Sequence, residues 1–176
     1  MRLKLRREFL SRSLYLAAVV IAWSCGGAAE KEDEFPDVKG TYGGLGGGSG
    51  LSDQRWVATD GSVATRLCNL KVGITEQSGA TFTGYIQRVP VNNNPPDNCT
   101  SQGTIAGEVA KDRTIRFQLT QARWSTCTAV GTAEYAGTIV SGDLNANGSV
   151  ALQCDDGTAI TVRDHLTAAL PHLPGL

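Results

Sequence analysis

The feature that most constrains the fold is an alternation of apolar and polar residues with a period of two. It begins near Val38 and is clearest at residues 68–75, 115–119, 150–154 and 160–163. This period is typical of β-strands that bury one face and expose the other. The composition agrees, because the chain has 21 glycines and a single methionine, a balance that favours short strands and turns over helices.

The alternation predicts eight strands, at residues 38–43, 66–77, 80–89, 103–111, 113–122, 133–141, 149–155 and 158–164. Turn signals separate several of them, at Ser78-Gly79, Lys111-Asp112, Asn147-Gly148 and Asp156-Gly157. Such local connections favour an all-β, eight-stranded antiparallel up-and-down barrel. A two-sheet β-sandwich is the alternative. The inward face reads as wholly apolar, which suits either a packed core or a pocket for an apolar ligand.

Residues 1–24 have the layout of a secretory signal peptide, a segment expected to be disordered or helical. Basic residues precede a ten-residue apolar stretch from Leu14 to Trp23, which is half the length that a transmembrane helix needs. Within the basic part, Arg6-Arg7-Glu8-Phe9-Leu10 resembles the twin-arginine export signal. An ordinary basic leader is the alternative. Either interpretation predicts export.

The segment around Cys25 resembles a bacterial lipobox, in which the cysteine becomes the first mature residue and carries acyl chains such as palmitate. The matching residues are Ala22-Trp23-Ser24-Cys25, and residues 25–37 are a charged, largely acidic stretch typical of a flexible linker. The resemblance implies a lipid anchor in the bacterial outer membrane. Ordinary signal-peptide cleavage, which would leave a periplasmic or secreted protein, is the alternative.

The remaining four cysteines, Cys68, Cys99, Cys127 and Cys154, are predicted to lie at one end of the barrel if the strands run up and down. Three pairings are possible. Neighbouring strands favour the disulfides Cys68–Cys99 and Cys127–Cys154, and an oxidising compartment outside the cytoplasm would allow them.

The two longest predicted loops, residues 43–65 and 89–102, fall at the same end as the cysteines. Long loops of this kind often carry function. Trp56 and Trp124 would lie near this mouth, and with Tyr42 they are the candidate ligand-contacting residues. The alternative is that these aromatic side chains only cap the core.

The first predicted strand contains Gly40-Thr41-Tyr42, which is similar to the Gly-x-aromatic motif of lipocalin-like and avidin-like (calycin) barrels. The predicted strand order from Val38 to about Asp164 also resembles theirs. The resemblance implies a closed barrel able to hold a ligand, and it assigns no functional residue.

Other candidate sites are few. Asp143, Asn145 and Asn147 resemble the first half of a calcium-binding loop, although a hairpin turn would use the same residues. Only two histidines occur, His165 and His172, and Asp164 beside the first is interpreted as a strand end. We therefore expect no catalytic residues, no cofactor and no other metal site.

The formal net charge is −1. Residues 1–24 contribute +4, so the rest of the chain carries −5, which disfavours nucleic-acid binding. The predicted domains are a signal peptide (1–24), a lipidated linker (25–37), a barrel (38–165) and a tail (166–176). We expect a membrane-anchored lipoprotein whose barrel binds a small apolar ligand or an envelope component without catalysis. Alternatives are a protein-interaction or protease-inhibitor module, a structural envelope lipoprotein and an enzyme on a calycin scaffold.

Overall fold

The computed structural model describes residues 34–46, 49–91 and 99–170. The predictions for the signal peptide, the twin-arginine pair and Cys25 therefore lie outside the described residues, as does the end of the predicted tail. Within the described ranges, no helix has the length and apolar character that a membrane span requires.

The described chain folds into one antiparallel sheet of ten strands. The strands are β1 Gly40–Gly43, β2 Gly50–Ala58, β3 Val63–Ser78, β4 Thr81–Pro90, β5 Ser101–Val109, β6 Thr114–Trp124, β7 Cys127–Ala129, β8 Ala133–Val140, β9 Asp143–Cys154 and β10 Ala159–Ala169.

The sheet closes on itself because β3 pairs with β2 on one side and with β4 on the other. Two of the barrel's walls are each built from two short strands. β1 and β2 pair with successive parts of β3, and β7 and β8 both lie between β6 and β9. Ten strands thus make an eight-stranded closed barrel. The predicted fold is confirmed, and the β-sandwich alternative is wrong.

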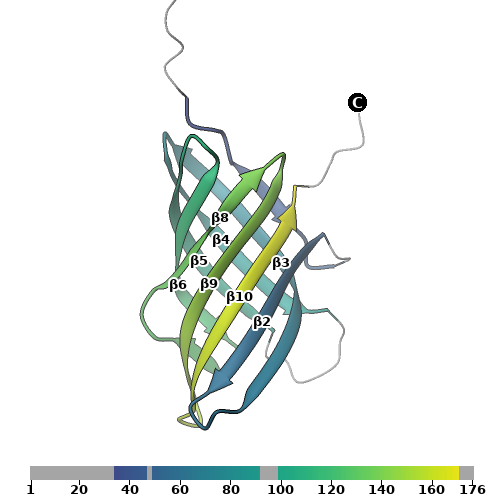
Figure 1. Cartoon of the computed structure of the whole chain (residues 1–176), viewed down its shortest axis with the longest axis vertical. Coiled ribbons are helices and arrows are strands. Elements are labelled where there is room, and N and C mark those ends of the chain that lie inside the picture. Colours follow the sequence, from purple (N-terminus) through teal and green to yellow (C-terminus); the bar gives the residue numbers. More distant parts are fainter. Residues whose placement is uncertain (1–33, 47–48, 92–98, 171–176) are drawn as a thin grey trace, which may run out of the picture. The chain divides into compact units, whose positions relative to one another are not determined.

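The connections alternate between the two ends of the barrel, as the up-and-down prediction requires. The turns 59–62, 125–126 and 155–158 lie at one end, near both disulfides; we call it the disulfide end. Figure 1 shows the β2–β3 and β9–β10 turns together at the bottom of the barrel, with β2, β10 and β9 side by side in front.

The interior is packed with side chains from all the walls. Among the rings, Phe117 stacks on Tyr135 with centroids 5.0 Å apart, and Phe82 lies 6.4 Å from Phe117. Leu70, Leu119, Leu152 and Leu166 are also buried in this cluster. The middle of the barrel is therefore a packed core, because the inward positions of short strands meet across a barrel of this size.

The eight predicted strands are all present, but some boundaries and one turn were wrong. β10 continues through Ala169, so residues 166–169 belong to the barrel and not to the tail. The predicted turn at Asn147-Gly148 lies inside β9, and the β8–β9 turn is at Ser141-Gly142 instead. Gly148 pairs with Tyr135 across the sheet, and its lack of a side chain leaves room for the tyrosine ring.

We expect Gly148→Ala to lower the free energy of unfolding by about 1–3 kcal/mol, the usual cost of overpacking. A Cβ at Gly148 would stand only 2.6 Å from Tyr135 Cε1, so the ring would have to move. Chemical denaturation of the full chain measures the effect. Gly46→Ala is the control, because a Cβ at Gly46 meets nothing within 4 Å. Equal stability of the two variants would contradict the expected clash.

Candidate ligand site at the disulfide end

Two disulfides cross-link neighbouring parts of the barrel wall at the disulfide end. Cys68 is bonded to Cys99 with Cα atoms 5.6 Å apart, and Cys127 to Cys154 with Cα atoms 3.8 Å apart. The favoured pairing is the one observed. Disulfides persist in oxidising compartments, so they indicate a domain outside the cytoplasm.

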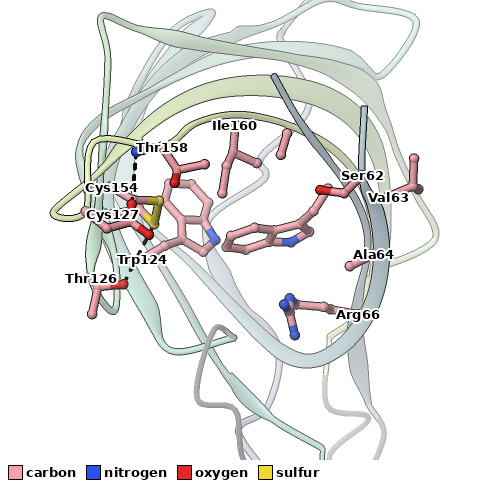
Figure 2. Close-up of a pocket in the computed structure, with 13 residues that line it drawn as sticks. Ser62, Val63, Ala64, Arg66, Trp124, Thr126, Cys127, Cys154, Thr158 and Ile160 are labelled. Carbon is pink, nitrogen blue, oxygen red and sulfur yellow. Dashed lines mark hydrogen bonds between the residues drawn. A yellow bond between two sulfur atoms is a disulfide. The ribbon is translucent and has the colours of Figure 1, made fainter. Parts of the chain in front are cut away.

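A cavity of about 310 Å³ opens at the disulfide end. We call it the mouth pocket, and it is lined among others by Trp56, Trp124, Arg66, Ile160 and the disulfide Cys127–Cys154. Figure 2 shows the guanidinium of Arg66 and the indole nitrogen of Trp124 both directed toward the middle of this space. The structure thus brings the two predicted mouth tryptophans together at one cavity.

Most of the predicted long loop at residues 43–65 is in fact strand. Among its described residues, only 44–46, 49 and 59–62 lie outside strands, and a hairpin turn at Asp60-Gly61 joins β2 to β3. The apolar–polar alternation did not indicate a strand at β2, because the inward positions of β2 are Ser52, Gln54 and Trp56. Two of these are polar, so the segment lacks the apolar alternation of a half-buried strand.

Trp56 forms one side of the mouth pocket and is held by polar partners. Its Nε1 donates to Gln54 Oε1 over 2.9 Å, and the guanidinium carbon of Arg66 lies 5.0 Å from the centre of its ring. Arg66 Nε is buried without a hydrogen-bond acceptor among the described residues. Burial lowers the pKa of Arg66, since removal from water disfavours the charged form.

Trp124 is fully buried at the inner wall of the mouth pocket. Its ring lies 5.2 Å from the guanidinium carbon of Arg88, which lies deeper in the barrel. Its Nε1 has no hydrogen-bond acceptor among the described residues. The described part of the fold therefore supplies no partner for this indole N–H. Leaving a buried donor unsatisfied costs about 1–3 kcal/mol.

Deeper inside the barrel than the two tryptophans, a buried ion pair joins β4 to β10. The guanidinium of Arg88 contacts the carboxylate of Asp164, and neither side chain is exposed to solvent. Tyr135 donates to Asp164 Oδ2 over 2.9 Å, and Ser52 donates to Asp164 Oδ1 over 2.6 Å. Arg88 also donates to Ser52 Oγ, 3.1 Å away, and to Ser101 Oγ, 3.3 Å away. We call these residues the Arg88–Asp164 network.

The network perturbs the ionisation of its members. Burial opposes the charge of Arg88, but the attraction of Asp164 and Tyr135 and the hydrogen bonds to both together outweigh it, and the pKa of Arg88 is raised. Burial and the charge of Asp164 raise the pKa of Tyr135. Gln54 continues the network toward the mouth by donating to Ser52 Oγ over 2.9 Å. The floor of the mouth pocket is therefore a rigid, hydrogen-bonded layer.

The prediction that the inward face is wholly apolar was wrong. Ser52, Gln54, Arg88, Ser101 and Asp164 all face inward and are buried. The interpretation of Asp164 as a strand end was also wrong, because it lies in the middle of β10. Asp164 lies two residues after Val162 and two before Leu166, and this spacing already indicated in the sequence that its side chain faces inward.

One acidic side chain lines the mouth pocket. Asp156 lies in the β9–β10 turn, where its Oδ1 accepts a hydrogen bond from the backbone N–H of Thr158 over 2.9 Å. Hydrogen bonds from Thr158 lower the pKa of Asp156. This carboxylate is engaged within its own turn, and no described ion pair links it to Arg66.

Tyr42 lies apart from the two tryptophans. It is buried on β1, and its hydroxyl donates to the carbonyl of Val38 over 2.7 Å, on the side of the barrel away from the disulfide end. Val38 N in turn donates to Gln77 Oε1 near the end of β3. The structure therefore places Tyr42 away from the mouth pocket, on the part of β1 that pairs with Val72 of β3.

We expect Tyr42 to contribute a fall of about 2 kcal/mol in the free energy of unfolding as the pH rises from 10 to 12. Burial and the charge of Asp37 raise the pKa of Tyr42 to about 12, whereas an unfolded tyrosine titrates near 10. Above pH 10 the unfolded chain loses a proton that the folded chain keeps, so unfolding becomes more favourable. Urea denaturation at several alkaline pH values measures this, and Tyr42→Phe should make the profile shallower by this amount, while the raised pKa of Tyr135 keeps part of the slope. An unchanged profile in Tyr42→Phe would contradict the assignment.

The candidate calcium ligands are not gathered into a loop. Asp143, Asn145 and Asn147 lie on the extended strand β9 and are all exposed. Alternate strand positions are about 7 Å apart, so the three side chains are spread along the outer face. His165 Nε2 lies 3.2 Å from Asn145 Oδ1 on the same face. Among the described residues, no group of three histidine, cysteine or acidic side chains is placed to hold a metal ion.

The sequence was compared with known protein families and with curated proteins, and neither comparison finds a match.

Proposed function

We propose that this protein is an exported, lipid-anchored envelope protein whose barrel binds a small ligand at the mouth pocket without catalysing a reaction. The observation that carries the proposal is the cavity of about 310 Å³ with Trp56 and Trp124 in its wall. A cavity of this size, lined by aromatic side chains and a few polar groups, is typical of small-molecule sites.

The ligand is assigned to the mouth pocket because the middle of the barrel is already filled. Leu119, Phe117 and Tyr135 occupy the core, and the Arg88–Asp164 network lies beneath the tryptophans. The pocket is also held in shape before any ligand arrives, because the Cys127–Cys154 disulfide forms part of its wall. Such preorganisation reduces the entropic cost of binding.

The buried ionisable groups favour binding over catalysis. Asp164, Arg88 and Tyr135 are the residues whose chemistry would suit proton transfer, but they satisfy one another and are buried. A general acid or base must come within hydrogen-bond reach of its substrate. The network is therefore better suited to supporting the pocket floor than to reacting with a ligand.

Native mass spectrometry of the full chain, released gently from detergent, tests the binding proposal. We expect an additional mass that is lost on denaturation and is reduced in the variant Trp56→Ala. The surface variant Val130→Ala is the control, because Val130 is 60 % exposed and lies outside the residues lining the pocket. A tightly held mass that persists unchanged in Trp56→Ala would place the ligand elsewhere.

The anchor is tested separately by labelling cells with radioactive palmitate. We expect the wild-type chain to take up label and the variant Cys25→Ala to take up none. The support for this part of the proposal is the lipobox-like sequence ending at Cys25. Uptake of label by the Cys25→Ala variant would contradict the proposed anchor and would not bear on the binding proposal.

A further inference from the structure

Resting on the proposed function, we infer that the ligand of the mouth pocket is a small organic anion, with a flat apolar body and one carboxylate-like group. The inference depends on two hydrogen-bond donors, Arg66 and Trp124, that line the same cavity and have unused N–H groups. Figure 2 shows both of them directed into the space between the lining residues.

Arg66 supplies the positive charge. Its guanidinium has no carboxylate within ion-pair distance among the described residues, and its Nε is buried without an acceptor. The guanidinium lies against the ring of Trp56 at 5.0 Å, so it is partly removed from water and fixed in direction. A planar guanidinium with free N–H groups is suited to the two oxygens of a carboxylate.

Trp124 supplies a second donor, for which the described residues provide no acceptor. The side chain is fully buried, and its Nε1–H has no acceptor among the described residues. Because an indole nitrogen donates and cannot accept, it selects a ligand that presents an oxygen or another acceptor. By contrast, the Nε1 of Trp56 already donates to Gln54.

Arg66 is the one cationic side chain of the lining, and no described ion pair gives it a carboxylate partner. Arg88 lies against the ring of Trp124, but its charge is balanced by Asp164. Asp156 is the one acidic residue of the lining, and it accepts hydrogen bonds from Thr158 in its own turn. The cation that remains without a carboxylate partner at the pocket is therefore Arg66.

The rest of the lining suits an apolar body. Trp56 and Ile160 contribute apolar surface, and Ala58 and Ala64 leave room beside them. The ring of Trp56 presents a flat face, on which flat ligands pack well. The pocket thus combines an apolar wall with a small, directed set of donors.

Isothermal titration calorimetry of the full chain in detergent tests the inference with 1-naphthoate and with 1-naphthamide, its neutral isostere. We expect the wild type to bind naphthoate about tenfold more tightly than naphthamide, and Arg66→Gln to remove that preference. Trp124→Phe, which keeps a ring but lacks the N–H, should weaken naphthoate binding by several fold. The matched control is Arg55→Gln, an equal charge change at an exposed position of the neighbouring β2.

The outcomes separate the inference from the proposal on which it rests. If the wild type binds both probes equally well and Arg66→Gln changes neither affinity, the pocket binds ligands but the anion inference is wrong. If the wild type binds neither probe at millimolar concentration, the inferred flat anionic ligand class is wrong, whereas the native mass spectrometry of Trp56→Ala decides separately whether the pocket binds a ligand. If Arg55→Gln weakens naphthoate as much as Arg66→Gln does, the preference comes from net charge and the specific role of Arg66 is excluded.

Discussion

Asp164→Asn is expected to lower the free energy of unfolding by about 3–5 kcal/mol, the largest single effect predicted for this chain. The substitution keeps the shape of the side chain but removes the charge that balances Arg88. Since the Arg88 side chain has no exposure to solvent, its cation would be left buried and uncompensated. Guanidinium denaturation followed by far-ultraviolet circular dichroism measures the loss, with an unchanged m-value as evidence that the fold is retained.

Two comparisons make this expectation specific. Asp155→Asn removes an exposed ion pair with Arg123, whose nitrogen and oxygen atoms are 3.9 Å apart, and should cost less than about 1 kcal/mol. The double variant Arg88→Leu/Asp164→Leu removes both buried charges and should recover much of the lost stability. A cost for Asp164→Asn no greater than that for Asp155→Asn would show that the network contributes little to stability.

Removal of the Cys127–Cys154 disulfide by replacing both residues with alanine should cost about 2–4 kcal/mol. The bond closes a segment with a sequence separation of 27 residues, and a cross-link of that span restricts the unfolded chain substantially. Because both cysteines line the mouth pocket, the same variant should also weaken ligand binding there. Thermal denaturation and naphthoate titration of the double variant measure the two effects.

The other disulfide provides the matched control. Cys68–Cys99 has a sequence separation of 31 residues, so its removal should cost a similar amount of stability. These two cysteines do not belong to the lining of the mouth pocket, and binding should therefore survive. Equal loss of binding in both double variants would mean that the disulfides act through global stability alone.

The barrel could be predicted from the sequence because its signal is local. An antiparallel strand reveals itself through neighbours two positions apart, and the turns at Gly79, Asp112 and Gly157 depend on a few adjacent residues. The cysteine pairing followed from the same pattern, since consecutive strands alternate direction and bring Cys68 near Cys99. Trp56 and Trp124 were predicted at the mouth by the same reasoning.

Two of the failures occurred where the interior is polar. β2 was missed because Ser52 and Gln54 occupy its inward positions, and Asp164 was taken for a strand end for the same reason. Polar residues at inward positions contradict the apolar pattern unless their partners are known. Those partners are distant in the chain: Arg88 and Asp164 are 76 residues apart, and Ser52 and Asp164 are 112 apart.

The sequence by itself therefore favoured the closed up-and-down barrel, located eight of its ten described strands and indicated the end at which the cysteines gather. Only the tertiary structure decided that the barrel is filled, that a charged pair crosses its interior, and that Arg66 and Trp124 share a pocket with N–H groups to spare. The physical reason is that an apolar–polar alternation with a period of two shows which face of a strand is buried, and this can be read from each strand separately. A hydrogen bond or an ion pair across the barrel depends on where distant strands come to lie.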